Sequence, residues 1–367
     1  MANKTLNNAK KQKLDEFYTQ LSDIEKELKN YKKQFKNKIV FCNCDDPEMS
    51  NFYYYFVSNF NEIGLKKLIT THFEIDKTSY KIEYSGGADV RGNKEMVIKR
   101  AIALSKKNPL KQNFEQGSQG DLFNVEPVRS YSGDFRSPEC IKLLKESDIV
   151  VTNPPFSLFR EYVEQLIEYK KKFLIIGNVN AISCKEIFKL IKQDKIWLGY
   201  NCVRHFKMPN GTMFESARSF WYTNLDSAKR HEDIILYRTF INNENKYPTY
   251  DNYDAINVDK AVDIPMDYAG LMGVPITFLD KYNPKQFKIL GITSGRDEFE
   301  AFPIKRYINP KQINKNGTTT NGSKANTRAT LLLSKKPNGI YYTADNVNGY
   351  LSILYARILI KNKRLGD

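Results

Sequence analysis

Short apolar runs alternate with helical patterns from about residue 21 to residue 200, and this alternation predicts an α/β fold. Each run is too short for a buried helix, and its composition is typical of a strand that is buried on both faces of a sheet. Tight alternation of strand and helix implies right-handed crossovers and therefore a parallel sheet. The predicted strands cover residues 39–42, 67–71, 148–152, 173–176 and 196–198.

Capping signals mark where several of the helices are expected to begin. Ser137 followed by Pro138 predicts a helix to about Lys145, because proline is favoured at the first helical position. Ser-x-x-Glu capping boxes at Ser22 and Ser183 predict two further helix starts. Apolar residues at helical spacing predict helices over 21–35 and 157–170.

Residues 14–200 are therefore predicted to form one domain with a parallel sheet and helices on both of its faces. A Lys- and Asn-rich tail at residues 1–13 precedes this domain and is expected to be flexible. Residues 105–130 are polar and contain glycine, which predicts a surface insertion.

The pattern changes after about residue 200, where Asn, Tyr, Pro and Gly separate short strand-like pieces. We interpret residues 201–353 as a second, irregular β-rich region. Within it, residues 314–330 have the composition of a loop, with Lys and Arg interspersed. Residues 354–367 are predicted to form a final strand and a basic tail.

Composition favours a polyanionic partner. Lys and Arg number 57 against 42 for Asp and Glu, which gives a formal charge of +15, and such an excess attracts phosphates. An AT-rich genome also raises Lys, Asn, Tyr and Phe, so charge alone leaves this interpretation open. No apolar run approaches the length of a membrane span and the first residues are polar, so we expect a soluble cytoplasmic protein.

The cysteines and histidines do not indicate a metal site. Cys42 and Cys44 have the wrong spacing for a zinc knuckle, and the three histidines are scattered along the chain. We expect no bound metal, and we interpret the five cysteines as buried, reduced thiols.

The segment Asn153-Pro154-Pro155-Phe156 is the strongest candidate for a catalytic site. It follows a predicted strand, and the carboxyl ends of strands are where open α/β sheets bind ligands. The Asn153 side-chain oxygen and the Pro154 carbonyl can accept the two N–H groups of an exocyclic amine, while the prolines stiffen the turn. Phe156 offers a flat face for a planar base. A simple strand-ending turn is the alternative; the context favours methyl transfer to an amine.

Three other segments are candidates for a methyl-donor pocket. Asp45-Asp46-Pro47 follows the first predicted strand, and Asp134-Phe135 precedes the strand that ends at the asparagine. Phe17-Tyr18-Thr19 precedes the first helix. The usual Gly-x-Gly is absent from the first turn, so each segment taken alone is equally consistent with an ordinary turn.

The order of these segments resembles the EcoRI-type adenine-specific DNA methyltransferases. The resemblance covers most of the chain and is weakest over about 77–130, 203–218 and 294–350. The matching runs are Asp15–Gln20, Phe41–Pro47, Gly133–Ser137, Ile149–Tyr162, Lys172–Ile176, Tyr250–Val258, Met272–Leu279 and Arg357–Leu365.

The resemblance implies a Rossmann-like domain that uses S-adenosylmethionine to methylate N6 of a flipped adenine in double-stranded DNA. Asn153, Pro154, Pro155 and Phe156 would then form the catalytic turn, with direct displacement at the sulfonium methyl and no covalent enzyme intermediate. The implied S-adenosylmethionine residues are Phe17, Tyr18, Thr19, Cys44, Asp45, Asp46, Pro47, Asp134, Phe135 and Asn153.

Residues 201–353 would then recognise the DNA target, with Lys324, Arg328, Arg204 and Lys207 as candidate DNA contacts. Base-reading loops are expected in the weakly matching stretches. We expect a monomer that belongs to a restriction-modification or DNA-protection system, with any cognate endonuclease acting separately. Two alternatives remain open at this point: a methyltransferase for RNA or for protein glutamine, and a non-catalytic DNA-binding protein with a methyltransferase fold.

Overall fold

The computed structural model describes residues 17–44, 50–72, 80–87, 121–126, 134–208, 211–294 and 303–366. The chain forms two compact units. The first unit comprises Met1–Ala181 and Ile196–Ser227, and the second comprises Ile182–Lys195 and Ala228–Asp367. The predicted tail at 1–13 and most of the predicted insertion at 105–130 lie outside the described residues.

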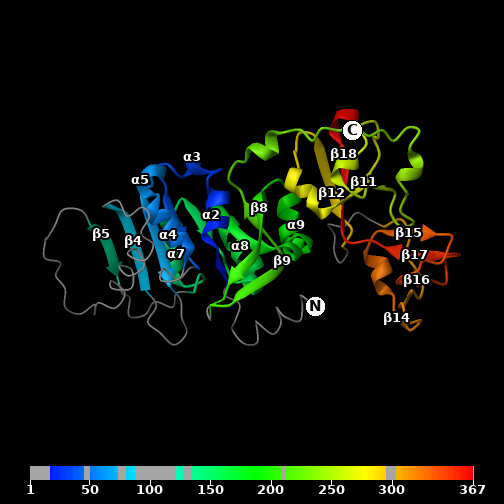
Figure 1. The fold of residues 1–367 in the computed structure, drawn as a ribbon, viewed down its shortest axis with the longest axis horizontal. Helices are drawn as coiled ribbons and strands as arrows, with labels where there is room; N and C mark the ends of the chain where they lie inside the picture. Colours follow the sequence, from blue (N-terminus) through cyan, green and yellow to red (C-terminus); the bar gives the residue numbers. More distant parts are fainter. Residues whose placement is uncertain are drawn as a thin grey trace. The chain divides into compact units, whose positions relative to one another are not determined.

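Figure 1 shows the ribbon of the chain coloured along the sequence. Four parallel strands form the centre of the first unit, as the alternating pattern predicted. Apolar residues fill most of β2 and β6, because both faces of these strands are covered. The pairing places β6 between β2 and β7, with β3 on the other side of β2. The four strands are β2 (Ile39–Cys42), β3 (Lys67–His72), β6 (Ile149–Thr152) and β7 (Lys172–Asn178).

Antiparallel strands extend this centre on both sides, so the expectation of a purely parallel sheet was wrong. Strands β8 and β9 are antiparallel neighbours, and the Met208 N–H donates to the Thr212 carbonyl (2.8 Å) where the chain reverses between them. The full order is β1-β8-β9-β7-β6-β2-β3-β4-β5. The added strands are β1 (Tyr18–Thr19), β8 (Trp197–Lys207), β9 (Met213–Thr223), β4 (Tyr80–Gly87) and β5 (Asp121–Glu126).

Helices cover the sheet in two groups. The first group is α2 (Leu21–Leu28), α3 (Lys32–Phe35), α4 (Asn51–Ser58) and α5 (Phe60–Ile63). The second group is α7 (Pro138–Glu146) and α8 (Phe159–Glu168), which contact β2 and β7 respectively. The first unit is therefore mixed α/β, as predicted.

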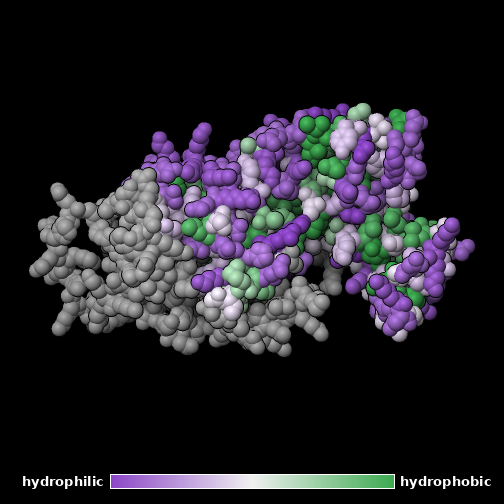
Figure 2. Space-filling model, viewed as in Figure 1, coloured by the Kyte–Doolittle hydropathy of each residue, from purple (hydrophilic) through white to green (hydrophobic). Residues whose placement is uncertain are grey.

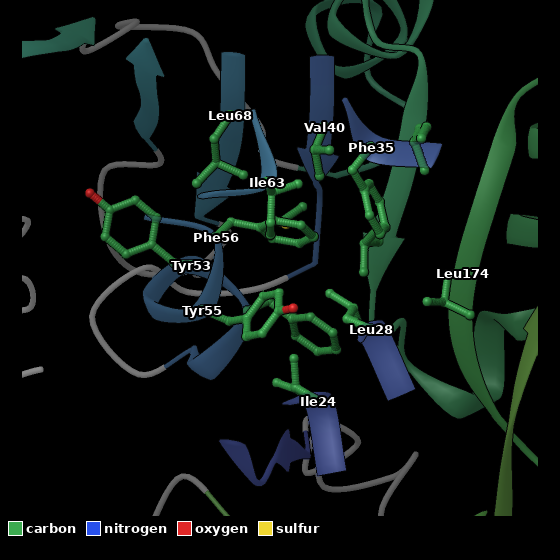
Figure 3. Close-up of a cluster of buried hydrophobic side chains, with 14 of the residues drawn as sticks. Ile24, Leu28, Phe35, Val40, Tyr53, Tyr55, Phe56, Ile63, Leu68 and Leu174 are labelled. Atoms are coloured by element: carbon green, nitrogen blue, oxygen red, sulfur yellow. The ribbon is translucent and has the colours of Figure 1, made fainter. Parts of the chain in front are cut away.

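The first group of helices packs against alternate residues of the sheet to form the core in Figure 3. Side chains of α2 and α4 share this core with those of the strands, for example Leu28, Phe56 and Val40. Each fully buried side chain of this kind contributes about 1.5–3 kcal/mol. The intervening strand residues, such as Phe41 and Val150, are also buried, because they point to the opposite face.

The helix starts agree with one of the three capping predictions. Ser137 accepts the Cys140 N–H (3.2 Å) and Pro138 begins α7, as predicted. The capping box at Ser22 was wrong: the Gln20 carbonyl already accepts the Ile24 N–H (3.2 Å), so Ser22 lies inside the first turn. The box at Ser183 was wrong for a different reason, because the next helix is capped at Cys184 and Ser183 belongs to a preceding 3₁₀ turn.

A buried carboxylate ties α2 to β8. The register of β8 with β9 shifts between Leu198 and Cys202, and this bulge presents backbone amides to α2. Glu27 accepts the N–H groups of Tyr200 (2.7 Å) and Asn201 (2.8 Å) and a third hydrogen bond from the Asn201 side chain (2.8 Å). We call this arrangement the Glu27 clamp; it fixes the position of the helix relative to the edge of the sheet.

Gly199 lies where the Glu27 clamp leaves no room for a side chain. A Cβ atom at this position would overlap Glu27 Oε1 and lie 2.7 Å from Trp221 Cβ. We expect Gly199→Ala to lower the free energy of unfolding by about 1–3 kcal/mol, because overpacking forces the clamp apart. Urea denaturation would measure the change. Gly339→Ala is the matched control, since nothing lies within 4 Å of its Cβ position; equal stability of the two variants would contradict this expectation.

The second unit contains two small sheets. One has the order β10-β11-β18-β12, and α9 (Lys185–Lys192) contacts its strand β12. Its strands are β10 (Ile256–Asn257), β11 (Met272–Pro275), β18 (Arg357–Asn362) and β12 (Phe287–Ile292). The other has the order β14-β13-β16-β17-β15. Its strands are β14 (Thr319–Asn321), β13 (Lys311–Ile313), β16 (Tyr341–Thr343), β17 (Tyr350–Ile353) and β15 (Thr330–Leu333).

Further sequence expectations concern the predicted loop at residues 314–330, the surface, the cysteines and membrane-spanning helices. Strand β14 and a 3₁₀ turn at Ser323–Thr327 lie within the segment predicted as a loop. Hydrophilic residues cover most of the described surface visible in Figure 2, with apolar patches between them. Cys42 and Cys140 are buried, but Cys202 is exposed, so the expectation of uniformly buried thiols was wrong. In the described part of the chain, no helix combines the length and apolar character of a membrane span.

Candidate active site

Asn153 follows β6 at the carboxyl edge of the parallel strands and is buried, with 6% of its surface exposed. Its Nδ2 donates to the Phe17 carbonyl (2.5 Å). Its Oδ1 is buried and has no hydrogen-bond partner among the described residues. A buried acceptor without a partner is costly and calls for an explanation such as a bound ligand. The main-chain contact therefore orients the amide so that its oxygen remains available to a donor.

The two prolines stiffen the turn that follows. Pro154 is buried and Pro155 is half-buried. The Pro155 carbonyl accepts the Leu158 N–H (3.0 Å), which closes a 3₁₀ turn over Phe156–Leu158 and leads directly into α8. This hydrogen bond occupies the Pro155 carbonyl, so the Pro154 carbonyl remains the candidate for the second acceptor.

Phe156 belongs to a cluster of four aromatic rings beside Asn153. Its ring centroid lies 5.4 Å from that of Phe17 and 5.8 Å from that of Phe206. Phe17 in turn stacks on Phe214, with centroids 4.6 Å apart and an interplanar angle of 17°. Phe156 is only half-buried, whereas Phe17 and Phe206 are buried. The cluster thus holds Phe156 in place and leaves part of its ring accessible.

The segment Phe17-Tyr18-Thr19, a candidate for the donor pocket, lies next to the Asn-Pro-Pro-Phe turn. Tyr18 and Thr19 pair with Lys207 and Phe206 of β8, so this edge strand follows the aromatic cluster. Asn51 Nδ2 donates to the Thr19 carbonyl (2.6 Å). The Thr19 hydroxyl is buried and has no partner among the described residues.

The ends of β2 and β3 bring further polar groups to the same edge. Cys44 N–H donates to the Thr152 hydroxyl (3.2 Å), which joins the end of β2 to the residue before Asn153. Asn43 and Thr70 are also buried, and within the described ranges Asn43 Nδ2 and the Thr70 hydroxyl lack partners. Sequence reasoning did not single out Asn43 or Thr70 as candidates, although both lie at or near the ends of predicted strands.

Asp134 and Phe135 make their contacts near α8. Asp134 binds the Arg136 guanidinium (2.5 Å), and the hydrogen bonds from that side chain lower the pKa of the Asp134 carboxyl. Phe135 packs edge-on against Tyr162 with centroids 5.0 Å apart, and its carbonyl accepts from Gln165 Nε2 (3.1 Å). Both partners of Phe135 lie on α8, the helix that follows the catalytic turn.

The remaining DNA-contact and donor-pocket candidates are divided among the first unit, the second unit and the segments outside the described ranges. Arg204 and Lys207 are exposed on β8, on either side of the buried Phe206 of the aromatic cluster. Lys324 is exposed and Arg328 is half-buried, and both belong to the second unit. Asp45, Asp46 and Pro47 lie outside the described residues.

The α/β fold with an Asn-Pro-Pro-aromatic turn at the carboxyl edge of its parallel strands places the chain in the class of methyltransferases that act on planar amines. Comparison with known proteins identifies the family within this class. The model of a family described as "Adenine-specific methyltransferase EcoRI" matches residues 5–363, and the chain belongs to this family. The resemblance predicted from the sequence is therefore confirmed, and the protein is an adenine-specific methyltransferase.

Curated relatives agree with this assignment. Type II methyltransferase M.EcoRI of Escherichia coli is 48% identical over 316 residues, which are 81% of this chain and 91% of the relative. M.MgeORF184P of Mycoplasma genitalium is 39% identical and M.MpnI of Mycoplasma pneumoniae is 38% identical, each over 303 residues, 77% of this chain and 84% of the relative. No solved structure matches the chain.

Proposed function

We propose that the protein transfers a methyl group from S-adenosylmethionine to N6 of an adenine that is flipped out of double-stranded DNA at a specific site. The observation that carries this proposal is the buried Asn153 Oδ1, which lacks a partner among the described residues and belongs to the same turn as the half-buried ring of Phe156. A planar base with an exocyclic amine supplies both a donor for the oxygen and a face for the ring.

Asn153 is proposed to hold the amine during transfer. The adenine amino nitrogen is a weak nucleophile because its lone pair is delocalised into the ring. Hydrogen bonds from both N–H groups, one to Asn153 Oδ1 and one to the Pro154 carbonyl, favour the pyramidal form in which the lone pair is available. Because the Phe17 carbonyl binds Asn153 Nδ2 (2.5 Å), the amide is already oriented before the base arrives.

Several described residues fit S-adenosylmethionine. Asn43 Nδ2 and the hydroxyls of Thr19 and Thr70 are buried polar groups without partners in the described part of the chain, as expected for a polar ligand site. With Tyr18 and Cys44 they are proposed to line the donor pocket. S-adenosylmethionine supplies the electrophilic methyl group when bound. Asp45, Asp46, Asp134 and Phe135 remain proposed members of this pocket.

The finer description of fold and context also belongs to the proposal. We propose that the first unit is a Rossmann-like methyltransferase domain, because its parallel strands present the site at their carboxyl ends. The second unit is proposed to recognise DNA, with Lys324 and Arg328 as contacts. The relatives are named Type II methyltransferases, and on that basis we propose a restriction-modification role. A separate cognate endonuclease, monomeric action and a cytoplasmic location are proposed with it.

Methylation of DNA in cells that express the protein tests the proposal. Mapping N6-methyladenine across that DNA is expected to reveal a single recurring sequence motif. Transfer of tritium from labelled S-adenosylmethionine to duplex DNA, RNA or protein then separates the substrate classes. Transfer to RNA or protein alone, or no transfer at all, would replace the proposed function with one of its two alternatives.

Phe156→Ala is expected to weaken capture of the flipped base. Base–aromatic stacking contributes about 1–3 kcal/mol per base, so KM for duplex DNA should rise by about 5- to 150-fold. Steady-state tritium transfer over a range of DNA concentrations would measure this change. Phe156→Tyr, which keeps the ring, is expected to restore most of the affinity; an unchanged KM in Phe156→Ala would contradict stacking on this residue.

A further inference from the structure

The part of the second unit that contains the five-stranded sheet is unusually basic. No acidic residue occurs from Ala301 to Ala344, while the same stretch contains eight lysines and arginines. They are Lys305, Arg306, Lys311, Lys315, Lys324, Arg328, Lys335 and Lys336. A uniformly positive segment attracts the phosphates of nucleic acid.

Strands β13 and β14 form a two-stranded ribbon at one edge of this sheet, and we call residues 311–321 the polar ribbon. All three residues of β14 are exposed, and Thr319 and Thr320 carry hydroxyl groups. Lys311 and Lys315 are also exposed and form no ion pair within the described ranges. The ribbon thus presents donors and acceptors together with uncompensated positive charge.

The turn of the polar ribbon is ordered by its own side chains. Asn314 N–H donates to the Thr318 carbonyl (2.9 Å), and Gly317 has φ +80°, which suits a glycine. Asn314 Nδ2 donates to the Thr318 hydroxyl (3.0 Å), which in turn donates to Asn316 Oδ1 (2.7 Å). A turn with this network needs little further ordering on binding.

The base of the polar ribbon is anchored to a small core. Gly322 N–H donates to the Pro310 carbonyl (3.0 Å), and a Cβ on Gly322 would lie 2.5 Å from that backbone, so only glycine allows this approach. Tyr342, part of the core cluster with Leu351, donates from its hydroxyl to Gln312 Oε1 (2.5 Å). The ribbon therefore projects from a rigid support, which is the arrangement that precise recognition requires.

From these observations we infer that the polar ribbon enters the major groove of the duplex and selects the methylated sequence. The major groove accommodates a two-stranded β-ribbon, and its base edges are read by side-chain donors and acceptors. Lys311 and Lys315 contact phosphates, while Asn316 and Thr319 face the base edges; Thr320 pairs with Gln312 and points to the opposite face of the ribbon. This inference rests on the proposed function, because it names the element that selects the DNA on which the first unit acts.

Two variants of the full chain test the inference. In Lys311→Gln/Lys315→Gln, binding to a fluorescein-labelled duplex that carries the mapped motif should become less dependent on salt, with the slope reduced by about 0.9 for each phosphate that is no longer neutralised. In Thr319→Ala, the protein should still methylate adenine but at a broader set of sequences. Lys281→Gln/Lys288→Gln removes the same charge from exposed positions elsewhere in the second unit and serves as the control.

The outcomes are distinguishable from failure of the proposed function. If the wild-type chain methylates no DNA, the proposed function fails and no motif is mapped, but anisotropy with a labelled duplex of mixed sequence still compares the salt slopes of the ribbon variant, the control and the wild type. A reduced salt slope with an unchanged motif would overturn base reading and leave only phosphate binding. The same slope and the same motif in the ribbon variants as in the control would overturn the inference and leave the ribbon as a solvated sheet edge.

Discussion

Asn153→Ala is expected to lower kcat for methyl transfer to duplex DNA by about 10²–10³-fold, the usual cost of removing one preorganised hydrogen bond to the reacting group. In the proposed function Asn153 binds the amine through a single buried oxygen, and no other side-chain group described at the turn would replace it. Alanine keeps the backbone of the turn and the prolines, so the duplex should bind nearly as well as to the wild-type protein.

Two measurements separate this result from a general loss of structure. Tritium transfer at saturating DNA gives kcat, and anisotropy with the same duplex gives affinity. Asn30→Ala is a suitable control, because Asn30 is exposed on the surface near α2 and its amide donates only to backbone carbonyls of that helix. Near-normal turnover by Asn153→Ala would refute the proposed role of the catalytic turn.

Glu27→Ala is expected to destabilise the first unit strongly. It removes the acceptor for the Tyr200 and Asn201 N–H groups (2.7 and 2.8 Å), and each buried donor left without a partner costs about 1–3 kcal/mol. Urea denaturation should show a loss of several kcal/mol. Glu25→Ala on the exposed face of the same helix should have little effect, and an equal loss in both variants would argue against the Glu27 clamp.

The contribution of Glu27 should also depend on pH. Burial raises the pKa of its carboxyl above the ordinary value of 4.5, although the hydrogen bonds from Tyr200, Asn201 and Tyr31 lower it in part. The folded state therefore binds the proton more tightly than the unfolded chain, so this stabilisation is fully present below pH 4.5 and is lost as pH rises through the folded-state pKa. The difference in free energy of unfolding between wild type and Glu27→Ala should therefore shrink as pH rises from 4.5 through the folded-state pKa of Glu27.

The sequence predicted the part of the fold in which periodicity is strong. All four central strands and the helices around the catalytic turn were expected, because apolar runs and the Ser137-Pro138 cap are local signals. Helices α4 and α5 were missed, since Asn51–Ser58 is almost uniformly apolar or aromatic and shows little helical pattern. The strand predicted at 196–198 is the start of β8, but its antiparallel direction and the membership of β9 in the first sheet were missed, because strand pairing is set by long-range contacts.

The candidate site was predicted in its centre and less well at its margin. The Asn-Pro-Pro-Phe segment was selected from the chemistry of its side chains, and Phe17-Tyr18-Thr19 was already a candidate for the donor pocket before the family resemblance; the structure places Phe17 beside the turn. Asn43 and Thr70 were missed, because their importance lies in burial without a partner, and burial is a property of the folded chain. The roles of the polar ribbon depend on an exposed edge strand that composition alone described as a loop.

The hydrogen bond from Asn153 to the Phe17 carbonyl has a consequence for protein synthesis. Phe17 leaves the ribosome early, but the strand that begins at Tyr18 pairs with Phe206 and Lys207 of β8, which are made much later. We therefore expect Asn153 to acquire this orientation only after β8 has been synthesised. Nascent or prematurely terminated chains should leave chromosomal adenines unmodified.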